Sequence, residues 1–184
     1  MNSSESEIHV AIHEDRDQIL DVHRDAFGDE EGETIAGLVM KMLDDPSAEP
    51  IYSIVARRCH EIIGHVLFTA VKIQPSDVSA QILAPLAVSP NQQGSGIGTK
   101  LIEESLVIMG SNGVELVFVL GYPQYYSRFG FTPAGAQGLQ APYPIPPKNA
   151  DAWMVKELSH GAIESNQGTV RCCNALDEAQ YWTE

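Results

Sequence analysis

The stretch Leu83–Leu106, LAPLAVSPNQQGSGIGTKLIEESL, decides the fold of this chain. An apolar strand ends there in a turn rich in Gln and Gly, and the turn opens directly into an amphipathic helix. The first N–H groups of a helix have no partner within the helix, and they lie at the positive end of its dipole. An anion is the natural occupant of such a place, and a pyrophosphate fits best.

Three ligand-binding patterns compete for this turn, beside the plain possibility of a tight strand–helix connection without a ligand. A Walker loop needs Lys and then Ser or Thr after its last glycine, whereas this chain has the reverse order in Thr99-Lys100. A dinucleotide fingerprint needs G-x-G-x-x-G and an acid at the end of the next strand, whereas Glu115 begins that strand. The third pattern, Q/R-x-x-G-x-G/A, is matched over 93–98 and is the one we favour.

Composition and charge exclude several classes of protein. The chain has 184 residues, of which 43% are hydrophobic, enough for one domain with a buried core. The net charge of −14 argues against nucleic-acid binding, which needs clustered Lys and Arg, and the one basic pair is Arg57-Arg58. We therefore expect backbone amides, rather than cationic side chains, to supply the positive potential at the turn, with Lys100 pointing outward. An acidic surface also favours an amine-bearing second substrate.

The cysteines and the N-terminal sequence favour a cytoplasmic protein. Cys59, Cys172 and Cys173 are an odd count, which we interpret as reduced thiols, and no motif supports Cys173 as a nucleophile. Residues 1–7 are acidic, unlike an export signal, and no apolar run approaches the roughly 20 residues of a membrane span. The six histidines show no metal-ligand spacing, so we expect no metal.

Hydrophobic periodicity predicts alternating strands and helices. The predicted strands cover 8–12, 51–56, 62–73, 78–88 and 114–120, a further strand starts at 130–131, and late strands cover 152–158 and 169–175. The predicted helices cover 15–27, 34–43, 96–110 and 123–129, with a polar turn at Gly28–Gly32 and a Pro-rich loop over 140–149. This order gives an α/β fold with a mixed sheet, antiparallel in its first half and with one parallel crossover afterwards.

The chain resembles the GNAT superfamily of acetyl-CoA-dependent N-acetyltransferases. The motif Q/R-x-x-G-x-G/A after the fourth strand is that family's pyrophosphate-binding motif, and GYPQYYSRFGF over Gly121–Phe131 is similar to its block after the fifth strand. Together with GHVLF over 64–68 and LAPLAVSP over 83–90, these blocks resemble one bacterial and archaeal branch of predicted acetyltransferases. The resemblance covers about 8–133. It implies a mixed, mostly antiparallel sheet of six or seven strands flanked by helices, with strands four and five splayed.

The same resemblance implies a single acetyltransferase domain over 1–184 and a set of ligand-binding residues. The core would cover about 8–134, with 135–184 as an extension packed on it. Pro85 interrupts the ladder of strand four, so the backbone groups of Leu86, Ala87 and Val88 are expected to pair with the pantetheine of acetyl-CoA. The Leu86 N–H would then polarise the thioester oxygen. The pyrophosphate would be held by Gln93, Gly94, Ser95, Gly96, Ile97, Gly98 and Thr99.

The catalytic groups are predicted less sharply. Tyr126 matches the family's tyrosine beside the cofactor sulfur and is our candidate general acid, with Tyr125 as the fallback. Glu33 is the candidate general base. Glu30, Glu31 and His65 are weaker options, and a water chain to bulk is another route for the proton.

The implied reaction is direct attack of a primary amine, from a small molecule or a peptide, on acetyl-CoA. Two alternatives remain. The enzyme could transfer an acyl group longer than acetyl, or the chain could be a non-catalytic acyl-CoA-binding regulatory or interaction module. No nucleic acid or membrane partner is expected, and a homodimer is possible.

Overall fold

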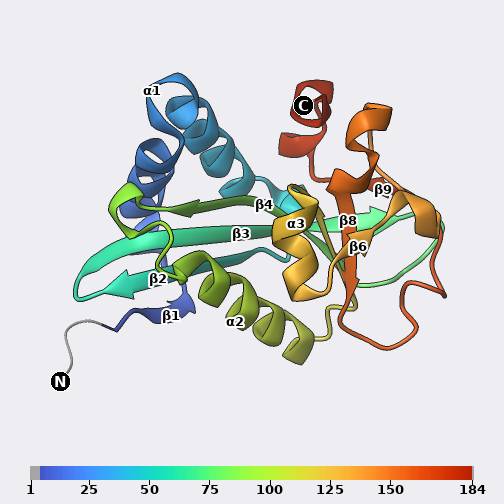
Figure 1. The fold of residues 1–184 in the computed structure, drawn as a ribbon, viewed down its shortest axis with the longest axis horizontal. Helices are drawn as coiled ribbons and strands as arrows, with labels where there is room; N and C mark the ends of the chain where they lie inside the picture. Colours follow the sequence, from blue (N-terminus) through green and yellow to red (C-terminus); the bar gives the residue numbers. More distant parts are fainter. Residues whose placement is uncertain (1–4, 184) are drawn as a thin grey trace.

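A computed structural model describes residues 5–183. Over these residues the chain forms one sheet of nine strands, in the order β1-β2-β3-β4-β5-β8-β6, with β9 joined to β3 and β7 joined to β9 (Figure 1). The strands are β1 (Glu7–Val10), β2 (Tyr52–Arg58), β3 (Glu61–Ile73), β4 (Ala80–Val88), β5 (Leu116–Leu120), β6 (Thr132–Pro133), β7 (Leu139–Gln140), β8 (Trp153–Glu157) and β9 (Gly168–Arg171). The pairs from β1 to β4 are antiparallel and the β4–β5 pair is parallel, which confirms the predicted α/β class and mixed sheet.

Helices cover both faces of the sheet. Helix α1 (Arg16–Leu43) and the short helical turns near the C-terminus lie on one face, and α2 (Ile97–Ser111) lies on the other (Figure 1). The short helix α3 (Pro123–Tyr126) follows β5. Each face has its own buried cluster, because alternate residues of a strand point to opposite faces. The α1 cluster includes Leu67 of β3, and the α2 cluster includes Val66 and Phe68.

Strand β4 contains an irregularity, and its pairing with β5 ends near it. Its parallel pairing with β5 runs from Ala80 to Leu83 and then stops, while its pairing with β3 continues to Val88. The β3–β4 register shifts between Val66, opposite Leu86, and Phe68, opposite Leu83, so two residues of β4 stand opposite one of β3. Because proline has no N–H to donate, the irregularity falls at Pro85, as the sequence predicts.

Two predictions about the helices and the tail need correction. The turn predicted over 28–32 is reduced to a single non-helical residue, Gly28, with φ +73° and ψ −171°, which kinks α1. The second helical segment then lies against the first, since a Cβ at Gly32 would lie 2.5 Å from the backbone oxygen of Arg24. The late strand predicted over 169–175 ends at Arg171. Strand β8 lies between β5 and β6, so residues beyond 134 complete the sheet as well as packing on it.

Candidate functional site

The glycine-rich turn leads into α2 through two left-handed residues. Gly94 has φ +75° and Gly96, the N-cap of α2, has φ +87°, a conformation that side chains with a Cβ rarely adopt. The hydrogen-bond ladder of α2 begins with Lys100 N–H donating to Gly96 O at 3.0 Å. The N–H groups of 97–99 precede that bond and are left at the positive end of the helix dipole. This geometry suits an anion.

Two cationic side chains lie beside the turn. The expectation that backbone amides alone supply the positive potential there therefore needs correction. A surface pocket of about 360 Å³ is lined by Arg58 and Lys100, together with Glu5, Ser6, Ser95, Gly96 and Ile97. Arg58 Nη1 donates to Gln92 Oε1 at 2.8 Å, and Lys100 Nζ donates to the Ser6 carbonyl. The spacing could have indicated Lys100, because a residue four positions after Gly96 lies one helical turn above it. Arg58 comes from β2, and only the folded sheet brings it here.

A hydrogen bond links the turn to the part of β4 that has no pairing with β5. Gln93 Nε2 donates to the Val88 carbonyl at 3.1 Å, so the first residue of the predicted motif holds the turn against the end of the strand. A Cβ at Gly98 would lie 2.9 Å from Tyr125 Oη and 3.9 Å from Leu86 Cδ2. Gly98 is therefore the point where α2, β4 and α3 meet. The structure thus brings the predicted residues of 86–88 and 93–99 next to one another.

Tyr126 is buried in α3, next to Tyr125. Its ring packs over Gly121, where an added Cβ would lie 2.4 Å from Tyr126 Cε2, and it meets Tyr125 and Phe131 edge-on. Burial, and then the neighbouring Tyr125, raises the pKa of the Tyr126 phenol well above its usual range. The phenol therefore keeps its proton throughout the neutral range. Burial also raises the pKa of Tyr125, with Arg128 acting in the opposite direction.

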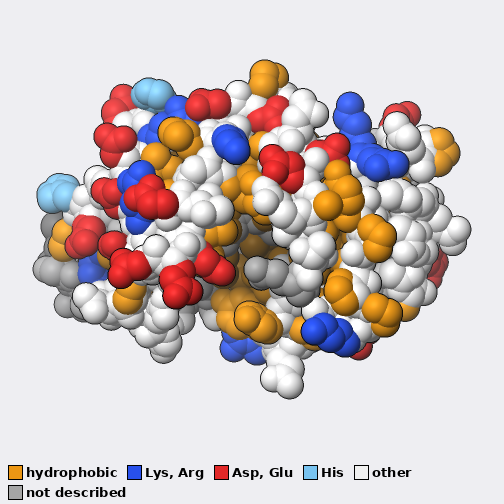
Figure 2. Space-filling model, turned by 90° about the horizontal axis from the view of Figure 1, so that it is seen from above, with side chains coloured by type: hydrophobic (Ala, Val, Ile, Leu, Met, Phe, Trp, Pro, Cys, Tyr) orange, Lys and Arg blue, Asp and Glu red, His pale blue; other side chains and the backbone are white. Residues whose placement is uncertain are grey.

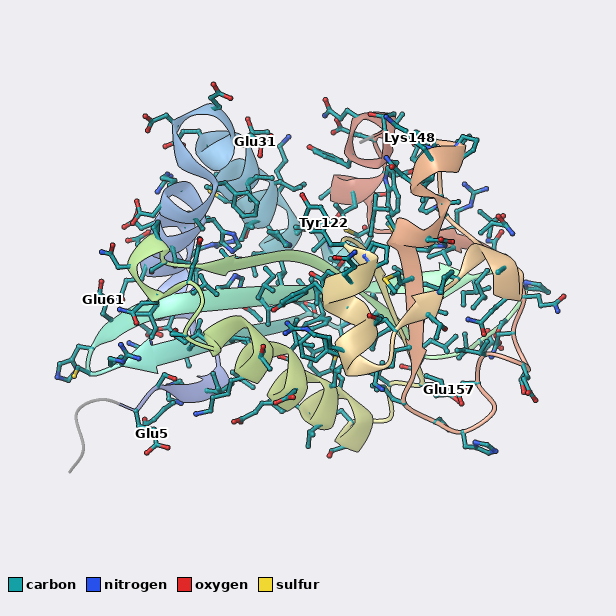
Figure 3. The ribbon with its side chains drawn as sticks, viewed as in Figure 1. Glu5, Glu31, Glu61, Tyr122, Lys148 and Glu157 are labelled. Atoms are coloured by element: carbon teal, nitrogen blue, oxygen red, sulfur yellow. The ribbon has the colours of Figure 1, made fainter. Side chains whose placement is uncertain are left out.

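The predicted carboxylate base lies elsewhere, on the surface of α1. Glu33 Oε1 accepts from Arg24 Nε at 2.9 Å, and the Glu33 side chain is 79% exposed. Glu30 and Glu31 are exposed as well, and Figure 3 shows Glu31 near the top of α1, shortly after its kink and away from the sheet. His65, the fourth candidate, is fully buried beneath α1. The role of Glu33 as a base stays a prediction.

Cys172 and Cys173 are poorly suited to nucleophilic attack. All three cysteines are free, and burial raises the pKa of the Cys172 and Cys173 thiols, which makes them weaker nucleophiles. Within 5–183, no three His, Cys, Asp or Glu side chains are grouped so that they could hold a metal ion. No helix of that same range is both long and apolar enough to cross a bilayer.

Comparison with known proteins identifies the family. The sequence model described as "Acetyltransferase (GNAT) domain" matches residues 7–134. The chain belongs to the GNAT acetyltransferase family. This GNAT chain is 38% identical over 169 residues to the Escherichia coli K12 protein named uncharacterized N-acetyltransferase YjhQ, covering 90% of this chain and 91% of that protein. It is also 34% identical over 110 residues to the protein named uncharacterized N-acetyltransferase YhbS of the same strain, covering 60% of this chain and 64% of YhbS.

Solved GNAT structures show the same fold. The Escherichia coli YhbS structure in complex with CoA has a TM-score of 0.84 at 29% identity, covering 94% of this chain and 92% of that one. A GNAT acetyltransferase from Brucella melitensis in complex with acetyl-CoA has a TM-score of 0.75 at 25% identity, covering 94% and 99%. These similarities confirm the GNAT fold expected from the sequence.

Proposed function

We propose that this GNAT chain is an enzyme that transfers an acetyl group from acetyl-CoA to a primary amine by direct attack of the amine. One observation carries the proposal: β4 and β5 part after Leu83, beside an open helix N-terminus that is flanked by Arg58 and Lys100. The GNAT relatives solved with CoA and with acetyl-CoA support this choice of cosubstrate. The three free cysteines fit our proposal of a cytoplasmic location.

The adjoining residues of 86–88 and 93–99 offer a complementary group for each part of acetyl-CoA. Phosphates would lie over the N–H groups of 97–99, with Arg58 and Lys100 neutralising the charge that remains. The pantetheine would run along Leu86–Val88, where β4 lacks a neighbour on its β5 side, and its amides would pair as an added strand would. The thioester oxygen would then lie near the Leu86 N–H, which stabilises the charge that develops there.

Tyr126 is the group proposed to meet the leaving sulfur. The amine nitrogen attacks the thioester carbon, the C–S bond breaks, and the electron pair leaves with sulfur as a thiolate. A phenol that stays neutral can donate to this thiolate as it forms, and burial keeps Tyr126 neutral. Glu33 is the carboxylate proposed from the sequence to take the amine's proton, and Glu33→Gln tests it directly.

The acceptor is proposed to be cationic. Figure 2 shows a hollow between the α1 side and the C-terminal side of the molecule, with hydrophobic side chains in its walls and acidic side chains gathered on the α1 side. Asp29, Glu30 and Glu31 are among the exposed acidic residues that follow the α1 kink. Such a field raises the local concentration of a polyamine, an aminoglycoside or a basic peptide.

Calorimetry with acetyl-CoA, followed by thiol release with spermidine, kanamycin and peptides bearing a free N-terminus or lysine, tests the proposal. Binding with thiol release on one of these amines supports it. Binding without release on any of them favours a non-catalytic acyl-CoA-binding module, and absence of binding refutes both.

Charge-matched variants test the proposed acetyl-CoA site. Arg58→Gln and Lys100→Gln are expected to weaken acetyl-CoA binding, whereas Lys72→Gln is the control for the loss of one positive charge. Lys72 is exposed on the far part of β3, where it pairs with Arg171 of β9. An equal loss of affinity in all three variants would contradict the assigned site.

A further inference from the structure

A buried chain of three polar side chains runs beneath α1. His23 of α1 and His65 of β3 are both fully buried, and His23 Nε2 lies 2.7 Å from His65 Nδ1. The other nitrogen of His65, Nε2, lies 2.9 Å from Ser53 Oγ of β2. The two imidazole rings meet edge-on at an interplanar angle of 85°. Both distances are those of hydrogen bonds, so the three side chains form one continuous path.

One end of this path reaches solvent. Ser53 is half-buried and lines a surface pocket of about 200 Å³, together with Ala11, Ile12, His13, Arg16, Ile19 and Leu43. A pocket of this size holds water. A proton that arrives at the Ser53 hydroxyl therefore has an exit to bulk.

The other end of the path, His23 Nδ1, has no partner within residues 5–183, and the middle of the path lies beside the unpaired part of β4. His65 stands opposite Ala87 in the β3–β4 pairing, so both side chains lie on the α1 face, and Ala87 belongs to the segment that β5 leaves unpaired. His23 Nδ1 is buried and has no hydrogen-bond partner among the described residues. Buried polar atoms of this kind are rare, and each destabilises the fold unless a ligand satisfies it.

The hydrogen bonds of the path allow two arrangements of protons, both electrically neutral. In the first, His23 Nε2–H donates to His65 Nδ1 and His65 Nε2–H donates to Ser53, which leaves a bare lone pair on His23 Nδ1. In the second, every bond is reversed and His23 Nδ1 carries the proton. A shift from the first to the second takes a proton in at His23 and releases one at Ser53, without storing a charge on the way.

Charge storage on the imidazoles would be costly. Burial lowers the pKa of His23 to about 4, and burial and then the neighbouring His23 lower the pKa of His65. At the outlet, the Arg16 guanidinium lines the pocket, paired with Asp44 at 2.6 Å, and disfavours a further positive charge that stays there. The path is therefore suited to passing a proton on, and poorly suited to holding one.

We propose that His23, His65 and Ser53 form a proton relay that carries the acceptor's proton from the side of α1 that lies beside the unpaired part of β4 to the pocket at Ser53. An N–H bond of the acceptor ammonium breaks and a bond to His23 Nδ1 forms; His23 Nε2–H passes to His65 Nδ1, His65 Nε2–H passes to Ser53 Oγ, and the Ser53 proton leaves on water. The acceptor keeps the electron pair with which it attacks the thioester. This inference rests on the proposed acetyl transfer and puts His23 in place of Glu33 as the group that takes the acceptor's proton. His23 Nδ1 is buried in the free protein, so the relay requires that acceptor binding exposes it, and His65 and Ser53 are positioning residues that act through His23.

Variants at the outlet separate a relay from a purely structural cluster. Ser53→Ala removes the exit, whereas Ser53→Thr keeps a hydroxyl there. With the amine that gives the fastest thiol release, His23→Gln is expected to lower kcat about 10²-fold, which is the lower end of the range for acid–base groups. Ser53→Ala is expected to lower kcat roughly tenfold and to reduce the solvent deuterium isotope effect, while Ser53→Thr retains both. Acetyl-CoA affinity should stay unchanged in all three.

Two results would overturn the relay. The first is a folded Ser53→Ala variant with the full kcat and isotope effect, even if it melts at a lower temperature. The second is loss of activity in Glu33→Gln with His23→Gln unaffected, which would assign the proton to the carboxylate. If His23→Gln does not fold, the comparison of Ser53→Ala with Ser53→Thr decides whether the relay operates.

A further measurement keeps the relay separate from the proposed function. If no amine is acetylated, the proposed function fails, and nitrogen NMR of the histidine rings then tests the relay alone. The relay predicts neutral rings with His23 Nδ1 bare, and ring N–H exchange with water that slows in Ser53→Ala. A proton fixed on His23 Nδ1, or equal exchange in wild type and Ser53→Ala, rejects it.

Discussion

Replacing Gly121 by alanine tests the position of Tyr126 without touching its hydroxyl. Gly121 follows β5 directly, and its φ is outside the left-handed region, so alanine fits the backbone. The added Cβ would lie 2.4 Å from Tyr126 Cε2 and 2.9 Å from Cδ2, where ordinary contacts begin at 3.4 Å. The ring must therefore move by about 1 Å. Tyr125 and Phe131 pack against two of its edges and limit the directions in which it can go.

The expected loss follows from that displacement. A shift of about 1 Å in a positioned catalytic group can cost roughly 10²-fold in rate, so Gly121→Ala is expected to lower kcat by about that factor. Overpacking of this kind also costs about 1–3 kcal/mol of the free energy of unfolding. Acetyl-CoA affinity should be unaffected, because Gly121 does not line the pocket beside the glycine-rich turn.

Thiol release, calorimetry and thermal unfolding measure the three quantities separately. If both changes act through the same phenol, the double variant Gly121→Ala/Tyr126→Phe should be no slower than Tyr126→Phe alone. Gly37→Ala is the matched control, since its added Cβ meets nothing within 4 Å and alanine favours the helix. A fully active Gly121→Ala, or a double variant whose losses multiply, would refute the placement of Tyr126 at the sulfur.

Three further predictions follow from the site. Arg58→Gln with Lys100→Gln is expected to weaken acetyl-CoA binding by about 10- to 100-fold and to flatten its salt dependence, as measured by calorimetry. Tyr126→Phe is expected to lower kcat about 10²-fold, and the wild-type rate should show no alkaline fall from this phenol up to about pH 10, because burial raises its pKa. Burial lowers the pKa of His23 to about 4, so the folded state favours the neutral ring. The free energy of unfolding is therefore higher by roughly 3 kcal/mol above about pH 6.5, and this contribution is lost as the pH falls toward 4. Denaturant unfolding across that range should show the loss, and His23→Gln should reduce it.

The strands and the turn could be predicted because their signals are local. β-branched runs mark β2 to β5, and the glycines at 94 and 96 occupy the left-handed positions that only glycine adopts readily. The open edge of β4 was also predictable, since Pro85 removes a donor from the ladder wherever it lies in a sheet.

The features that were missed depend on contacts between distant segments. Helix α1 continues beyond Gly28 because its second segment packs back on the first at Gly32, which no local pattern records. Arg58 reaches the glycine-rich turn only because β2, β3 and β4 are neighbours in the sheet. His23 has the spacing of an ordinary core residue on α1, and only the structure pairs it with His65.

The irregularity at Pro85 explains how one strand serves both substrates. In a regular strand, residues three positions apart point to opposite faces, yet Leu83 and Leu86 both pack on the α2 side because β4 carries one extra residue between them. Leu86 therefore faces Gly98 and the proposed path of acetyl-CoA, while Ala87 faces α1 and the buried histidines. Without the extra residue these two side chains would exchange faces. The bulge thus both frees the backbone of β4 and sets which side chains meet acetyl-CoA and which lie toward the proposed acceptor cleft.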